Sequence, residues 1–251
     1  MAASDTVSSV TTLAILTAAG SGSRLGRSIP KALVHLGGTP LVVHAARSLD
    51  RSGAVDAIVV TAPADYTEQI SRLLDGDPQV DVPVTVVAGG STRQASVAAG
   101  LAAAGEASVV LVHDAARPLA PARLVRRVVD AVQAGHGAVV PGMPLVDTVK
   151  RVAAPPLPGS GPRAESVQDT VERSGLRAVQ TPQGFSHDLL TRAHAHGAAR
   201  AEDQDMAASD DAGLVESLGE AVVVVRGDER AMKITTARDL EIADLLLAED
   251  E

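Results

Sequence analysis

The sequence predicts an α/β fold built on a doubly wound, mostly parallel sheet, and two observations carry that prediction. Unbroken Val, Ile and Leu runs alternate with Ala-, Leu- and Arg-rich helical stretches, and a glycine-rich loop directly follows the first run. Apolar strands separated by helices are expected where a parallel sheet is covered on both faces. The expected strands are residues 13–17, 57–61, 84–87, 109–112 and 138–140, and the expected helices are residues 40–49, 65–74, 92–103 and 121–134.

After Pro141 the alternation changes. An apolar stretch, a Pro/Gly-rich loop and two further extended stretches follow with no helical pattern between them, which predicts a β-hairpin arm over residues 142–180. The order within this arm is a strand at 144–152, the loop at 153–163, and extended segments at 165–172 and 176–180. The expected remainder is helices at 186–199, 210–218 and 236–247 and a strand at 221–226. We therefore expect one domain over residues 13–247, arm included, preceded by a disordered tail at 1–12.

Composition excludes several classes of protein. The 251 residues carry a net charge of −9, which disfavours a nucleic-acid-binding role, and they contain no cysteine, which removes disulfides, thiolate metal sites and cysteine nucleophiles. The first 12 residues lack a targeting pattern, and the apolar runs are far shorter than the roughly 20 residues that cross a membrane. We expect a cytoplasmic protein with neither nucleic acid nor membrane as partner.

The glycine-rich loop is the first candidate binding site. Gly20 and Gly22 allow backbone N–H groups to approach an anion closely, and Arg24 and Lys31 add two cations beside them. A tight strand-to-helix turn without a ligand is the alternative explanation. A dinucleotide fingerprint would need glycine where Leu25 stands, and the chain has no Gly-Lys pair for a P-loop. The loop therefore favours phosphate binding of another kind.

Seven segments, in order, resemble the motifs of the 2-C-methyl-D-erythritol 4-phosphate cytidylyltransferases of the non-mevalonate isoprenoid pathway. The resemblance covers about residues 13–247. The matching segments are AAGSGSRLG at 18–26 with PK at 30–31, GGSTRQASV at 89–97, VHDAARP at 112–118, DTVK at 147–150, QTPQ at 180–183, DDA at 210–212 and MKIT at 232–235.

The resemblance implies a Rossmann-like nucleotidyltransferase fold and the reaction of CTP with 2-C-methyl-D-erythritol 4-phosphate. The products are 4-diphosphocytidyl-2-C-methyl-D-erythritol and pyrophosphate, and the cofactor is Mg²⁺ or another divalent cation. The arms of two subunits interlock in the family, so it also implies a homodimer through the β-arm.

The resemblance assigns site residues in four groups. The catalytic cations are Arg24, Lys31 and Lys233, and Asp114 is placed near the metal. The CTP-binding residues are Ala18, Ala19, Gly20, Ser21, Gly22, Gly89, Gly90, Ser91, Ser96 and Asp114, with Arg93 bracing the loop. The residues for the second substrate are Arg117, Thr148, Arg173 and Thr181, with Arg173 reaching the substrate phosphate of the other subunit.

The residues also have simpler explanations. Ser91 or Thr92 is expected to cap the helix that follows, and Asp114 with Arg117 would form a local ion pair. Residues 209–211 predict a helix start capped by Ser209.

Other functions stay open on the sequence. A ribitol-5-phosphate cytidylyltransferase of the same fold has overlapping motifs, whereas a sugar-1-phosphate nucleotidyltransferase fits the 113–117 segment poorly. A nucleotide-binding regulator without turnover is the alternative from a different class. Pyrophosphate release with each acceptor distinguishes them.

Overall fold

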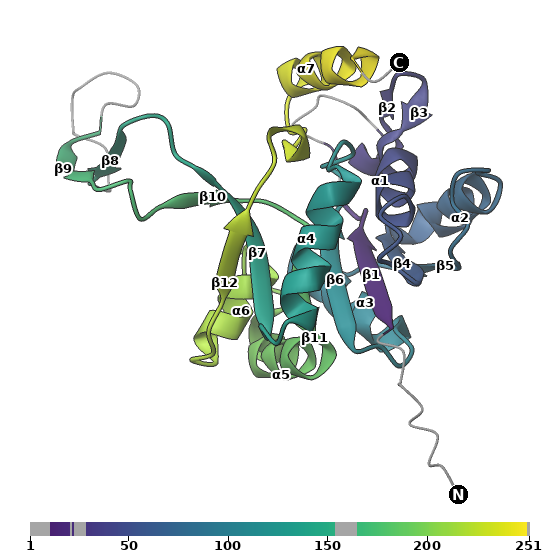
Figure 1. Cartoon of the computed structure of the whole chain (residues 1–251), viewed down its shortest axis with the longest axis horizontal. Helices are drawn as coiled ribbons and strands as arrows, with labels where there is room; N and C mark the ends of the chain where they lie inside the picture. Colours follow the sequence, from purple (N-terminus) through teal and green to yellow (C-terminus); the bar gives the residue numbers. More distant parts are fainter. Residues whose placement is uncertain (1–10, 21, 23–28, 154–164, 250–251) are drawn as a thin grey trace, which may run out of the picture.

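The computed structural model describes residues 11–20, 22, 29–153 and 165–249, and every structural statement concerns these residues. Figure 1 shows a body of strands and helices from which a ribbon projects to one side. The strands are β1 (Thr12–Thr17), β2 (His35–Leu36), β3 (Thr39–Pro40), β4 (Ala57–Ala62), β5 (Val84–Ala88), β6 (Val109–Asp114), β7 (Ala138–Pro144), β8 (Val149–Val152), β9 (Val167–Val171), β10 (Arg177–Val179), β11 (Gln183–Ser186) and β12 (Val223–Arg226). The α-helices are α1 (Leu41–Asp50), α2 (Thr67–Asp75), α3 (Arg93–Ala103), α4 (Ala122–Gln133), α5 (His187–Gly197), α6 (Asp211–Ser217) and α7 (Ala237–Ala248).

The main sheet has eight strands in the order β10-β7-β11-β6-β1-β4-β5, with β12 paired along β7. Strands β6, β1, β4 and β5 are mutually parallel, as are β7 and β12, while β10 and β11 run antiparallel to their neighbours. The predicted doubly wound, mostly parallel sheet is confirmed. Because the chain leaves β1 toward β4 and returns on its other side with β6, the strand order reverses at β1, where open α/β sheets bind ligands.

Alternate side chains of the central strands enter two aliphatic cores. Leu16 packs with residues of α1, α2 and α4 on one face, and Ile15 packs with residues of α3, α5 and α6 on the other. Figure 1 shows α1 and α4 in front of the sheet and α3, α5 and α6 behind it. The one Phe of the chain, Phe185, is completely buried in the second core. Strands covered on both faces hold their carboxyl ends rigidly, which is where the cavity described below lies.

Two helices begin directly after a threonine that caps them. Thr92 caps α3 by accepting a hydrogen bond from the Ala95 N–H at 3.0 Å, which confirms the expected cap. Thr236 and Asp239 form a capping box at the start of α7. Within the described residues no helix has the length and apolar character needed to cross a membrane.

Strand β11 was not predicted. Its sequence, QGFS, lacks the Val and Ile that mark the other strands, yet it lies between β6 and β7 and is almost fully buried. Gly184 explains the insertion: a Cβ there would lie 2.5 Å from Cγ1 of Val128, so α4 can pack this closely only against glycine. A strand whose residues are small so that a helix can pack closely against it lacks the Val and Ile pattern that predicts strands.

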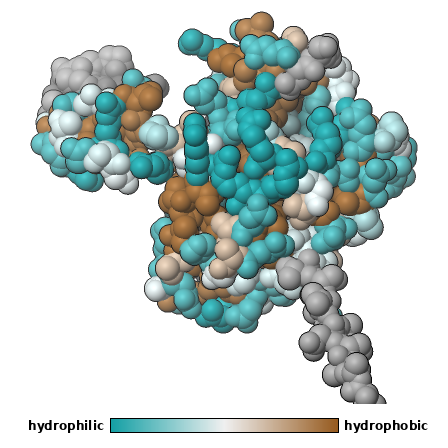
Figure 2. Space-filling view, viewed as in Figure 1, coloured by the Kyte–Doolittle hydropathy of each residue, from teal (hydrophilic) through white to brown (hydrophobic). Residues whose placement is uncertain are grey.

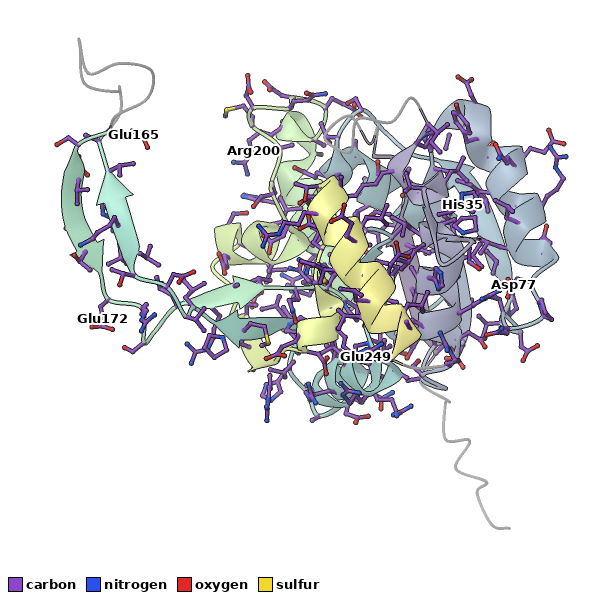
Figure 3. All side chains as sticks on the ribbon, turned by 90° about the horizontal axis from the view of Figure 1, so that it is seen from above. His35, Asp77, Glu165, Glu172, Arg200 and Glu249 are labelled. Atoms are coloured by element: carbon purple, nitrogen blue, oxygen red, sulfur yellow. The ribbon has the colours of Figure 1, made fainter. Side chains whose placement is uncertain are left out.

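The arm consists of β8 and β9, which pair as a separate two-stranded antiparallel sheet. The strand expected over 144–152 is wrong as one element, because β7 ends at Pro144 and β8 begins at Val149. Between them, the Val146 carbonyl accepts a hydrogen bond from the Arg173 side chain instead of a ladder N–H. Figure 3 shows Glu165 and Glu172 on this ribbon, well away from the body that carries His35 and Asp77. Most of the 153–163 loop and of the 1–12 tail lies outside the described residues.

Candidate nucleotide-binding site

A cavity of about 470 Å³ opens at the carboxyl ends of β1, β5 and β6. The register of the parallel strands aligns Thr17, the last residue of β1, with Asp114, the last residue of β6. The cavity is lined by Thr17, Ala18, Ala19, Gly20, Gly22, Lys31, Ala32, Gly90, Ser91, Thr92, Arg93, Ser96, Asp114, Ala115, Ala116, Gln204, Lys233 and Thr235. It thus combines the three loops that the sequence singled out.

The glycine-rich loop holds Lys31 at the cavity. The Lys31 backbone N–H donates to the Gly20 carbonyl at 3.1 Å, so the chain closes back on itself after the loop. Gly22 has φ of +73°, and a Cβ there would meet the Ile29 carbonyl and the Lys31 nitrogen at 3.0 Å. This turn requires glycine for both conformation and space. Ser21 and Arg24 lie outside the described residues.

The turn between β5 and α3 forms a second wall. A Cβ on Gly89 would lie 2.8 Å from the Ala19 Cβ and 2.9 Å from the Ser96 hydroxyl, so the two loops touch through this glycine. Ser96, buried on the first turn of α3, donates to the Thr92 carbonyl at 2.8 Å. The turn therefore brings the N-terminus of α3, the end of a helix that favours anions, against the glycine-rich loop.

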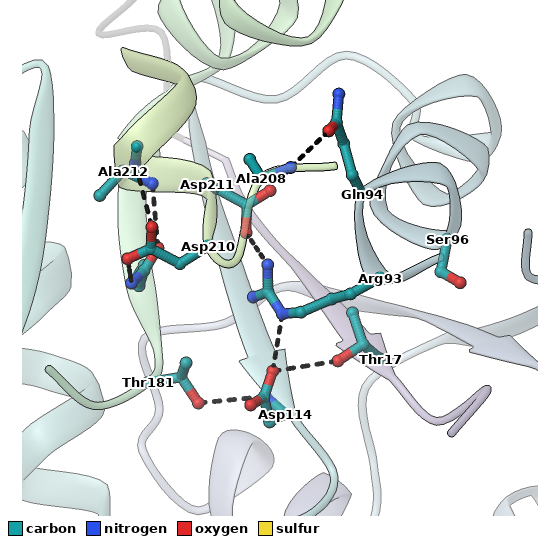
Figure 4. Close-up of polar contacts among 12 residues, drawn as sticks. Thr17, Arg93, Gln94, Ser96, Asp114, Thr181, Ala208, Asp210, Asp211 and Ala212 are labelled. Carbon is teal, nitrogen blue, oxygen red and sulfur yellow. Dashed lines mark hydrogen bonds and ion pairs between the residues drawn. The ribbon is translucent and has the colours of Figure 1, made fainter. Parts of the chain in front are cut away.

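Asp114 is the centre of a charge network (Figure 4). Its Oδ1 accepts from Nε of Arg93 at 3.1 Å, and its Oδ2 pairs with Nζ of Lys233 at 2.7 Å. Nη1 of Arg93 pairs with Oδ2 of Asp211 at 2.7 Å, and Oδ1 of Asp211 lies 2.9 Å from Nε2 of His194. The network joins the end of β6 to the starts of α3 and α6, so the wall is fixed by charge-assisted hydrogen bonds.

Burial and charge act in opposite directions on these groups. Burial would raise the pKa of Asp114, but attraction to Arg93 and Lys233 outweighs it and holds that pKa well below its ordinary value. The pKa of Asp211 is likewise lowered, with Arg93 overcoming the effect of burial. Burial lowers the pKa of His113 to about 4, so its ring is neutral at pH 7. The two carboxylates of the wall are therefore charged at neutral pH, and the imidazole of His113 beneath the wall is neutral.

Lys233 reaches the cavity because the segment between β12 and α7 is tied to the end of β6. The N–H of Ile234, the next residue, donates to the Ala116 carbonyl at 2.8 Å. The Lys233 side chain is 40% exposed, so its ammonium faces both Asp114 and the open cavity. Two lysines from distant parts of the chain therefore line one site.

Most of the expected CTP-binding residues line this cavity, and the residues expected to bind the acceptor do not. Thr181 lies behind the wall, where its hydroxyl accepts from the Asp114 N–H at 3.1 Å. Arg117 donates to the carbonyls of Ala231 at 2.6 Å and Val179 at 3.2 Å rather than pairing with Asp114. Thr148 and Arg173 are exposed residues of the arm. Acceptor binding by these four residues stays a prediction.

The sequence reading missed part of the network. The helix start at 209–211 was expected to be capped by Ser209, which is wrong: the Asp210 carboxylate accepts from the Gly213 N–H at 3.1 Å. That leaves Asp211, 1% exposed, to pair with Arg93 and His194. Because one aspartate is enough to cap a helix, the second of two adjacent aspartates could have been predicted to have another partner.

Comparison with known proteins agrees with this geometry. A family model described as "IspD: 2-C-methyl-D-erythritol 4-phosphate cytidylyltransferase" matches residues 12–249. A protein of that name from Streptomyces coelicolor is 49% identical over 239 residues, covering 94% of this chain and 85% of that protein. One from Nocardia farcinica is 50% identical over 235 residues, covering 94% of this chain and 93% of that protein.

Solved structures give the same result. The 4-diphosphocytidyl-2C-methyl-D-erythritol synthase from Anaerococcus prevotii superposes with a TM-score of 0.78 at 28% identity, covering 95% of this chain and 99% of the other. The 2-C-methyl-D-erythritol 4-phosphate cytidylyltransferase from Thermus thermophilus superposes with a TM-score of 0.71 at 35% identity, covering 95% and 98%. The chain therefore belongs to the 2-C-methyl-D-erythritol 4-phosphate cytidylyltransferase family.

Proposed function

We propose that this chain catalyses the reaction of CTP with 2-C-methyl-D-erythritol 4-phosphate, giving 4-diphosphocytidyl-2-C-methyl-D-erythritol and pyrophosphate. The chain is a nucleotidyltransferase of isoprenoid precursor biosynthesis by family membership. The observation that carries the proposal is the cavity at the switch point of the sheet, where a glycine-rich loop and two lysines from distant segments meet. Such a site suits a nucleoside triphosphate.

The reaction needs positioning and charge stabilisation rather than a protein nucleophile. A phosphate oxygen of the acceptor attacks the α-phosphorus of CTP, the bond from that phosphorus to the bridging oxygen breaks, and pyrophosphate leaves. Lys31 and Lys233 line the cavity and would stabilise the negative charge that grows on the phosphorus centre and the leaving group. Arg24 would contribute a third cation from the loop.

A divalent cation fits the donors of this site. The described residues contain no group of three or more His, Cys, Asp or Glu side chains that would hold a metal. Mg²⁺ needs less from the protein when it binds with a nucleotide, because one or two carboxylates and the phosphates suffice. Asp114 would be that carboxylate, since Oδ2 keeps a lone pair beside Lys233. Bound there, Mg²⁺ would supply charge neutralisation for the triphosphate.

The arm is the proposed dimer contact. A hairpin of two strands is marginally stable in water unless it packs against something. Apolar side chains are exposed on the arm and at its base, where Figure 2 shows hydrophobic surface. They are Val146, Val152, Val167 and Val179, of which Val146 is 82% exposed. In such a homodimer, Thr148 and Arg173 would reach the acceptor from the partner subunit, while Arg117 and Thr181 would support it from the body. A cytoplasmic location stays a prediction.

The test is pyrophosphate release from CTP with Mg²⁺, with 2-C-methyl-D-erythritol 4-phosphate and ribitol 5-phosphate compared in parallel. We expect a strong preference for the first acceptor. Preference for ribitol 5-phosphate would keep the CTP site and the chemistry but overturn the assigned acceptor. No release with either acceptor, together with tight CTP binding, would overturn the enzymatic proposal in favour of a regulator.

A further inference from the structure

Lys233 lies at the end of a segment, residues 227–233, that leaves the main sheet after β12. Gly142 of β7 pairs with Val179 of β10 on one side and with Arg226 of β12 on the other. The segment therefore starts across the end of β7 from β10. Its position relative to the cavity depends on contacts that span β7.

The buried side chain of Gln180 makes such a contact. Its Oε1 accepts a hydrogen bond from the Asp228 N–H at 2.9 Å, and its Nε2 donates to the Asp228 carbonyl at 2.8 Å. The Gln180 N–H donates to the Pro141 carbonyl at 2.8 Å, so the side chain extends from a residue fixed on β7. One amide thus pairs with both backbone polar groups of residue 228, as a neighbouring strand would.

Gly227 makes room for this amide. A Cβ at Gly227 would lie 2.5 Å from Oε1 of Gln180, although its φ is not positive, so glycine is required here for space. The Asp228 side chain has other partners: it accepts from the Arg230 N–H at 3.1 Å and pairs with Arg123 at 2.7 Å. Gln180 therefore holds the backbone from which the turn toward Lys233 begins.

The next residue holds the other half of the ion pair. The Thr181 hydroxyl accepts from the Asp114 N–H at 3.1 Å, and Oδ2 of Asp114 pairs with Nζ of Lys233 at 2.7 Å. Two consecutive residues thus hold Asp114 and the start of the segment that carries Lys233. Because one peptide bond joins Gln180 to Thr181, these contacts constrain the spacing between the carboxylate and the ammonium.

We propose that Gln180 is a positioning residue for the transfer reaction, which holds residue 228 so that the Lys233 ammonium stays at Asp114 and at the reacting phosphates. The inference rests on the proposed function, where Lys233 stabilises the charge that grows on the phosphorus centre. A cation aids this step only when it is in place beforehand, and a shift of about 1 Å can cost up to about 10²-fold in rate. Gln180 is not one of the described residues that line the cavity, so it acts through Lys233 rather than on a substrate.

The first variant is Gln180→Met, which keeps the volume of the side chain and removes both hydrogen bonds. We expect kcat for pyrophosphate release to fall about tenfold and both KM values to change less than kcat. Arg117 still donates to the Ala231 carbonyl, so Lys233 is displaced rather than released. Gly227→Ala should act in the same way, because its Cβ would push the amide aside, and it replaces Gln180→Met if that variant does not fold.

A double-variant cycle separates positioning from a general loss of structure. Gln180→Met should lower kcat in the wild-type background but not in the Lys233→Ala background, because it acts through Lys233. The matched control is Gln183→Met. Gln183 is also buried and makes two hydrogen bonds, to the Asp210 carboxylate at 2.8 Å and from the Ala212 N–H at 3.2 Å, but these partners belong to the start of α6. Any effect of this control should be the same factor in both backgrounds.

Amine labelling tests the placement of Lys233 without turnover. The chain has three lysines, Lys31, Lys150 and Lys233, so mass spectrometry of peptides can follow each one. With limiting acetic anhydride, Lys233 should react severalfold faster in Gln180→Met than in wild type, because pairing with a carboxylate keeps the amine protonated. Lys150, on the arm, should react at the wild-type rate.

Unchanged labelling of Lys233, or an equal fall of kcat in both backgrounds of the cycle, overturns the inference. Missing pyrophosphate release by the wild-type chain would instead overturn the proposed function, and the labelling would still test the position of Lys233.

Discussion

Two arginine–aspartate pairs, one in the cavity wall and one in the arm, differ in their surroundings. In the wall, Arg93 pairs with Asp211 at 2.7 Å, and the side chains are 21% and 1% exposed. In the arm, Arg151 pairs with Asp169 at 3.1 Å, and the side chains are 60% and 54% exposed. The wall pair continues to Asp114 and Lys233, whereas the arm pair spans one two-stranded ribbon.

The difference separates a region completed within one chain from a region for which we propose a partner subunit. Buried charges hold a fixed geometry only when each is paired, and a paired network then fixes the cavity before the nucleotide binds. Exposed charges on a ribbon are solvated and contribute little to its position. We therefore expect substitutions in the wall to act on folding and chemistry, and substitutions in the arm to act on assembly and acceptor binding.

The largest effect on stability is expected at Asp211. Asp211→Ala leaves Arg93 half-paired in a buried site and should lower the free energy of unfolding by about 3–5 kcal/mol. Asp169→Ala, the matched change in the arm, should cost below about 1 kcal/mol, because its pair is solvated. Urea unfolding of both variants checks this, with the midpoint and slope fitted separately. Equal costs at the two positions would break the comparison.

Lys31→Ala should lower kcat at least about 10²-fold, the scale of losing one preorganised electrostatic donor at a developing charge. Pyrophosphate release at saturating substrates measures it, and CTP affinity should change less than kcat. Arg72→Ala, which removes an exposed cation on α2, is the control and should behave as wild type. A near-normal kcat in Lys31→Ala would remove this lysine from the proposed chemistry.

The fold could be predicted where local pattern and tertiary role agree. The four parallel strands β1, β4, β5 and β6 are mostly apolar, and their Val, Ile and Leu runs predicted their bounds to within two residues. Strand β11 could not be found this way, because Gly184 and Gln183 were selected by their neighbours. Gly184 admits α4, and Gln183 donates to the Asp210 carboxylate at 2.8 Å. Such contacts are made with residues that are distant in the sequence, so they produce no periodic pattern from which a strand can be predicted.

The site divides in a similar way. Positions that act through the backbone, such as Gly20 and Gly22, can be predicted from the sequence, because closely spaced glycines after a buried strand are typical of a phosphate-binding loop. Charge pairs between distant segments do not: Asp211 follows Arg93 by more than a hundred residues, and each resembles an ordinary surface residue in sequence. The hydrogen bond from Ser91 to the Glu202 carboxylate could not be predicted for the same reason, because it forms only where the loop after α5 lies against the turn before α3.

The arm gives a test in which two defective variants restore each other. Arg173→Ala should raise the KM for the methylerythritol phosphate acceptor about tenfold or more, because a hydrogen bond to a charged group is lost. Mixed with Lys31→Ala, it should regain activity at low acceptor concentration. The mixed dimer pairs an intact cavity on one subunit with an intact arm on the other. Each variant assayed separately is the control, and no recovery on mixing would place the arm's role within its own subunit.

The smallest effect separates the regions by pH. His113 is fully buried under the wall, where its Nδ1 lies 3.0 Å from the Thr181 hydroxyl, and burial lowers its pKa to about 4. In the unfolded chain this histidine has a pKa near 6.5 and binds a proton that it does not bind in the folded chain. The free energy of unfolding therefore falls as the pH drops below about 6.5. From pH 6.5 to 5.5 this amounts to about 1 kcal/mol.

Histidine substitutions show whether this dependence belongs to the wall. His113→Gln should reduce the stability–pH slope between pH 6.5 and 5.5 and leave the part due to His44, whose pKa is also lowered by burial. His136→Gln, at an exposed position, should leave the slope unchanged. Residues 142–180 contain no histidine, so the arm adds nothing in this range. If His113→Gln is too unstable, NMR titration of the wild-type ring gives the same answer, because protonation of His113 above pH 6 would contradict its burial. A reduced slope in His113→Gln would mean that acid weakens the wall in this pH range, in which the arm has no histidine to protonate.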